Sequence, residues 1–122
     1  MTNDELKNRT KQFSLLILRL IEKLPNSISN RIVINQIVKS ATSVGANYRA
    51  VCRARSDREF ISKMNIVLEE SDETLFWLEI IIDKMWIERD QLEIIWKEGN
   101  ELTSIFVSAL KTINNRLNNN NK

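Results

Sequence analysis

The sequence of 122 residues contains no histidine, one cysteine, two glycines and one proline. Without histidine, the chain lacks the commonest general base and the commonest metal ligand. The single cysteine, Cys52, cannot form an intrachain disulfide and has no partner at a zinc-binding spacing. The scarcity of glycine and proline leaves little turn chemistry for an all-β fold. The composition therefore favours a helical protein that binds no metal and no organic cofactor.

Long apolar runs are also missing. The longest, around residues 80–82, is far shorter than the roughly 20 apolar residues that cross a bilayer. The N-terminus, Met-Thr-Asn-Asp-Glu, lacks the basic region and apolar run of a signal peptide. Together with the unpaired cysteine, these absences predict a cytoplasmic protein that does not associate with a membrane.

Apolar residues recur at alternating steps of three and four along most of the chain, which is the spacing of amphipathic helices. The pattern predicts helices over residues 3–24, 30–54 and 57–86, and a fourth from the turn at residues 87–90 to about Leu117. Short connections between long helices predict an all-α, antiparallel up-down-up-down four-helix bundle. Residues 1–117 form this bundle, and the Asn-rich residues 118–122 are predicted to be a disordered tail.

Three local features add detail to this bundle. The second helix has a core-facing stripe made of Ile34, Ile37, Ala41, Val44, Tyr48 and Val51. Ser56 followed by Glu59 is the pattern of a capping box at the start of the third helix. Gly99 falls on the core register of the fourth helix, where it indicates close approach to another backbone.

Charge is distributed unevenly along the chain. Residues 30–63 contain seven Lys or Arg against two acids, whereas residues 64–101 contain eleven acids against three bases. Such a polarised surface suits either an anionic partner or a second copy of the same protein.

Five bases crowd the junction of the second and third helices, and we call them the basic corner: Arg49, Arg53, Arg55, Arg58 and Lys63. Arg49 and Arg53 are one helical turn apart and share a face. Such a group can meet phosphates along a nucleic-acid backbone. The alternative for Arg49 is an internal ion pair with a carboxylate of the third helix.

Sites for catalysis are hard to find in this sequence. Glycine-rich phosphate loops are absent, and Glu70 and Glu73 lack the histidines of a di-iron bundle. We therefore predict a protein without enzymatic activity. A site built from a serine and a lysine, or from paired carboxylates, is the open alternative.

The motif Ser-Ala-x-Ser-Val-x-Ala-Asn at residues 40–47, followed by Arg-Glu-Phe-Ile at residues 58–61 and by Glu73 and Trp77-Leu78, resembles a known family. These are the four-helix-bundle proteins first noticed in intervening sequences of bacterial 23S rRNA genes. The resemblance covers about residues 6–115. Where the family usually has Glu-Gly, this chain has Arg49-Ala50, which resembles an arginine-rich subgroup.

The same family includes accessory proteins of diversity-generating retroelements, which form pentamers that bind nucleic acid and a reverse transcriptase. The resemblance thus implies a homo-oligomer, namely a pentamer, with RNA or DNA and a reverse transcriptase or other nucleoprotein as partners. We predict a self-associating accessory protein that binds nucleic acid or a nucleoprotein through the basic corner. The alternative is a protein–protein adaptor whose basic corner serves the subunit interface.

Overall fold

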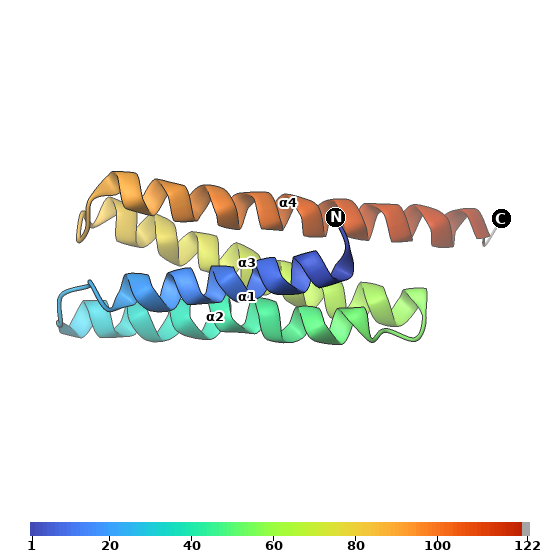
Figure 1. The fold of residues 1–122 in the computed structure, drawn as a ribbon, viewed down its shortest axis with the longest axis horizontal. Helices are drawn as coiled ribbons and strands as arrows, with labels where there is room; N and C mark the ends of the chain where they lie inside the picture. Colours follow the sequence, from blue (N-terminus) through green and yellow to red (C-terminus); the bar gives the residue numbers. More distant parts are fainter. Residues whose placement is uncertain (121–122) are drawn as a thin grey trace.

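The computed structural model describes residues 1–120, and four α-helices account for most of them. They are α1 (Asn3–Ile21), α2 (Ile28–Cys52), α3 (Asp57–Asp83) and α4 (Arg89–Asn120). Each helix runs antiparallel to the one before it, and α1 packs on both α2 and α4 (Figure 1). The prediction of an all-α, up-down-up-down bundle is confirmed.

The apolar stripes of the sequence form the core of this bundle. On α2 the predicted stripe is buried, with Ile34 at its edge. On α3 the heptad-like spacing of the sequence predicts a core stripe of Ile61, Met64, Leu68, Leu75, Leu78, Ile82 and Met85. Val67 and Ile81 beside this stripe are also buried, whereas Met85 is 82% exposed. Met85 has a left-handed backbone with φ of 56° and lies after the end of α3, so its side chain leaves the core.

Helix boundaries follow local capping. The Ser27 hydroxyl accepts a hydrogen bond from the Asn30 amide at 3.2 Å, and α2 therefore begins at Ile28, two residues before its predicted start. The Ser56 hydroxyl accepts from the Glu59 amide at 3.1 Å, which is one half of the predicted capping box, whereas the Glu59 carboxylate lies 3.5 Å from Arg55. Helices α1, α2 and α3 end two or three residues earlier than predicted.

The end of α4 lies later than predicted. Residues 118–120, which the sequence assigned to a disordered tail, continue the helix because no glycine or proline interrupts it. The rest of the predicted tail, residues 121–122, lies outside the described residues. Figure 1 shows this end of α4 extending beyond the other three helices.

Gly99 provides space for side chains. A Cβ atom at Gly99 would lie 3.0 Å from both Phe13 Cζ and Leu75 Cδ2, so the prediction of a backbone neighbour is wrong. The closer approach of two backbones is at Gly45 of α2, where a Cβ atom would lie 3.5 Å from the backbone of Thr10. This contact sets the short distance between α1 and α2.

Polar contacts tie α4 to its neighbours. The Arg9 guanidinium of α1 bonds both carboxylate oxygens of Glu98, and it lies 2.9 Å from a carboxylate oxygen of Glu101. At the other end of the bundle, Arg116 pairs with Asp57 at 2.6 Å and lowers the pKa of that carboxyl. Arg9 and Arg116 are therefore already occupied by carboxylates.

Candidate nucleic-acid interface

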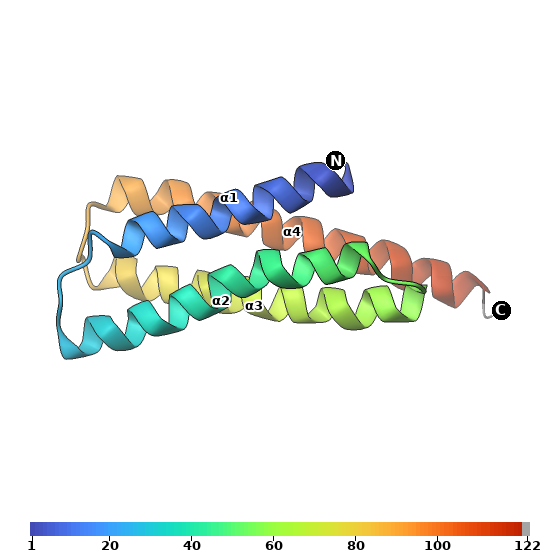
Figure 2. The ribbon, with the colours of Figure 1, turned by 60° about the horizontal axis from the view of Figure 1, so that its bottom comes forward.

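A groove between α1 and α2 gathers three cations. These helices lie side by side in both Figure 1 and Figure 2. The groove has a volume of about 340 Å³ and is lined by Lys7, Lys11, Ser14, Thr42, Gly45, Ala46 and Arg49. The uncharged lining residues are small, which lets the two helices approach closely at Gly45. The three charged lining residues are all basic, which suits an anionic ligand, although Lys7 also lies 3.8 Å from the exposed Asp4.

Arg49 lies at the centre of the predicted basic corner, and its side chain is exposed. None of the ion pairs found within residues 1–120 involves Arg49. The internal pair with a carboxylate of α3, which was the alternative from the sequence, does not form in this structure. Arg49 instead lines the groove together with Lys7 and Lys11.

The next two arginines continue this surface around the end of α2. Arg53 is the C-cap of α2 and uses its backbone N–H for this, so its exposed side chain remains available. Arg55, in the connection to α3, lies 3.5 Å from Glu59, but its side chain is 88% exposed. An ion pair that exposed is weak and leaves Arg55 able to change partners.

Arg58 and Lys63 belong to a different helix with a different environment. Lys63 is half-buried on α3, whereas Arg58 is exposed in its first turn. Arg58 begins an outward row of exposed residues on α3, which we call the α3 strip: Arg58, Ser62, Asn65, Glu69, Asp72, Phe76, Glu79 and Asp83. Beyond Arg58, each charge on this strip is negative. The basic corner therefore borders an acidic surface on the α3 side.

The acids of α3 crowd one another. Burial and the nearby carboxylates of Glu73 and Glu69 raise the pKa of Glu70, and the Lys39 ammonium opposes this shift. Like charges at this spacing repel a polyanion as well as each other. The α3 strip is thus an unfavourable surface for a polyanion, in contrast to the basic side formed by α1 and α2.

Comparison with known proteins connects this bundle to a family. Residues 3–108 match the 23S rRNA-intervening sequence protein family. The chain belongs to this family. A solved structure from Bacteroides thetaiotaomicron VPI-5482, of a protein with unknown function from the S23 ribosomal protein family, is similar with a TM-score of 0.80 and 36% identity. The alignment covers 87% of this chain and 98% of that one. No curated protein matches.

The family match spans the whole basic corner and the α1–α2 groove of this chain. Sequence reasoning missed Lys7 and Lys11, because only the packing of α1 on α2 brings them beside Arg49.

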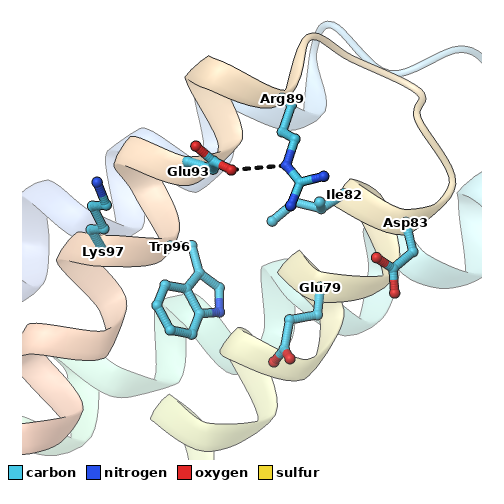
Figure 3. A pocket seen from close by; sticks show the side chains of 7 residues that line it. All are labelled: Glu79, Ile82, Asp83, Arg89, Glu93, Trp96 and Lys97. Carbon is cyan, nitrogen blue, oxygen red and sulfur yellow. Dashed lines mark hydrogen bonds and ion pairs between the residues drawn. The ribbon is translucent and has the colours of Figure 1, made fainter.

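A second hollow, of about 410 Å³, lies between the end of α3 and the start of α4 (Figure 3). It is lined by Glu79, Ile82, Asp83, Arg89, Glu93, Trp96 and Lys97. Arg89 Nε donates to Glu93 Oε1 at 2.8 Å, which neutralises one charge of each sign. With three acids and two bases, this hollow has no preference for phosphate.

Within residues 1–120, no group of three or more cysteines, aspartates and glutamates is placed to hold a metal ion. No helix in that range is both long and apolar enough to cross a membrane.

Proposed function

We propose that this chain is a non-enzymatic, cytoplasmic accessory protein that self-associates and binds RNA or DNA through phosphates. The observation that carries the proposal is the group of exposed cations that runs from the α1–α2 groove to the α2–α3 connection. Between Glu22 and Asp57 the chain has six bases and no acid. Packing adds Lys7 and Lys11 of α1 to this surface.

The proposed binding residues are the basic corner, extended by the two lysines of the groove. Arginine is suited to phosphate because its planar guanidinium donates two parallel hydrogen bonds. Tyr48, the one aromatic residue of α2, is 3% exposed and packs on Phe106, with ring centroids 6.2 Å apart. Bases therefore cannot stack on it, and recognition depends on charge and shape.

A mobility-shift assay of the wild-type protein with a structured RNA tests this proposal. At about 50 mM salt, where phosphate contacts are strongest, we expect a shift at micromolar protein or below. Unrelated RNA sequences of the same shape should shift equally, because phosphates carry no sequence information. Absence of any shift at low salt would contradict the proposal.

Self-association is supported by large apolar side chains on the surface of all helices except α1. They are Ile28, Ile32, Ile66, Phe76, Ile94 and Val107. Apolar surface of this kind is often covered by another subunit. The family resemblance favours a closed ring of five. Light scattering at micromolar concentration should give a mass several times 14.3 kDa, and a monomer at that mass would exclude self-association.

The second candidate is a protein–protein adaptor. It is favoured by the opposite charges of the exposed faces of α2 and α3, which could meet across an interface between two copies. In that case the basic corner would be buried between subunits. A reverse transcriptase or other nucleoprotein is a proposed partner under either function.

A further inference from the structure

We propose that the ligand is double-helical nucleic acid, and that one row of exposed residues along the whole of α2 binds its phosphate backbone. This inference rests on the proposed function. It names the class of nucleic acid and extends the site well beyond the basic corner.

The row, which we call the α2 strip, consists of Arg31, Asn35, Lys39, Thr42, Ala46, Arg49 and Arg53. Successive members are three or four positions apart, so they lie along one face of the helix. Six of the seven are exposed, and Thr42 is half-buried where it lines the groove. Four of them are cations, and the other three are small or polar and uncharged.

The α2 strip has no carboxylate of its own. Acids are absent from residues 23–56, and no member of the strip forms an ion pair within residues 1–120. Lys39 is near enough to Glu70 to lower its pKa, but its ammonium is exposed. Lys7 and Lys11 add two more cations beside the Arg49 end.

The length of the α2 strip matches a duplex. From Arg31 to Arg53 the helix rises by about 33 Å, at 1.5 Å per residue. One turn of B-form DNA spans about 34 Å. A rigid row of cations binds most favourably to phosphates that are already fixed in space, because the nucleic acid then loses no conformational entropy on binding. Beyond Arg31, the next position on this face is Ile28, which is exposed and apolar, so the cationic row ends there.

Single-stranded nucleic acid fits this surface less well. Proteins that hold single strands combine a positive groove with aromatic side chains on which the bases stack. The α2 strip contains no aromatic residue, and Tyr48 of the same helix is buried. A duplex keeps its bases stacked on each other and presents only its backbone, which is what the α2 strip can contact.

The test is the double variant Arg31→Glu and Lys39→Glu, both outside the basic corner. Its matched control is Lys97→Glu and Lys111→Glu, which makes the same charge change at two exposed positions of α4. Fluorescence anisotropy would be measured with an RNA duplex and a DNA duplex of about 20 base pairs, or two turns, and with one strand of each. Circular dichroism would confirm that both variants are folded.

For the wild type we expect at least about tenfold tighter binding of a duplex than of its single strand. The α2 variant should lose at least about tenfold in duplex affinity, whereas the α4 control should retain most of it. Tight binding of either duplex supports the inference, and the two duplexes show whether RNA or DNA is preferred. If the glutamate variant fails to fold, glutamine at the same two positions provides the test. It should reduce the slope of the logarithm of affinity against the logarithm of salt concentration by about two.

Two results would overturn this inference while leaving the proposed function intact. One is wild-type affinity of the folded α2 variant for duplex. The other is tighter binding of the single strand than of the duplex. If the wild-type protein binds neither form at low salt, the proposed function itself fails together with this inference.

Discussion

Raising the salt concentration from about 50 to 200 mM is expected to weaken nucleic-acid binding by about 100-fold for a subunit that contacts four phosphates. Each cation that neutralises a phosphate releases counterions, and added salt opposes this release. The α2 strip supplies four such cations, all exposed and free of ion pairs within residues 1–120. If several subunits contact one duplex, the affinity should depend more steeply on salt concentration.

The measurement for this prediction is a titration of wild-type protein against a labelled duplex at four or five salt concentrations. A plot of the logarithm of affinity against the logarithm of salt concentration should be linear, with a slope of about −4 or steeper. Circular dichroism at each salt concentration controls for changes in the bundle. An affinity that changes less than threefold over this range would show that phosphate contacts do not drive binding.

Replacing Arg53 and Arg58 with glutamate is expected to abolish binding and leave the bundle folded. The change reverses two charges that flank the α2–α3 connection. Arg53 caps α2 through its backbone N–H, which the substitution keeps. Glutamate at position 58 lies in the first turn of α3, where the helix dipole favours an acid, whereas glutamate at position 53 is disfavoured by about 0.3–1 kcal/mol. These two effects on stability offset each other.

Mobility shifts of this double variant, paired with circular dichroism and light scattering, test both halves of the prediction. The Lys97→Glu and Lys111→Glu variant again controls for net charge. If the folded Arg53→Glu and Arg58→Glu protein binds like the wild type, the basic corner is not the site. If it unfolds or dissociates into monomers, these arginines are structural, and the adaptor function gains support.

The fold was predictable because each helix has its own apolar period and short connections allow one simple topology. On α3 the predicted register holds for Met64, Leu75 and Leu78, which are buried, but it left out the buried Val67 and Ile81 and included the exposed Met85. This helix is apolar on more than one face, so periodicity alone could not choose the buried face. The neighbours of Gly99 were also beyond prediction, because Phe13 and Leu75 reach it from two other helices.

The candidate site was predictable only where it is local in sequence. Crowding of bases between Arg49 and Lys63 pointed to the basic corner, but crowding cannot show that Lys63 is half-buried. Lys7 joins Arg49 across a groove that exists only after α1 packs on α2. Arg31 and Lys39 do not cluster in the sequence, and they were overlooked although the predicted helix over residues 30–54 already places them on one face with Arg49 and Arg53.

The most direct measurement of the central claim is protection of lysine side chains from acetylation, read by mass spectrometry with and without bound duplex. Comparing the same assembly in both states removes any protection caused by self-association. We expect duplex to protect Lys7 and Lys11 of the α1–α2 groove and Lys39 of the α2 strip, and to leave Lys97 and Lys111 of α4 unchanged. Protection of the α4 lysines with none at Lys7, Lys11 or Lys39 would contradict it.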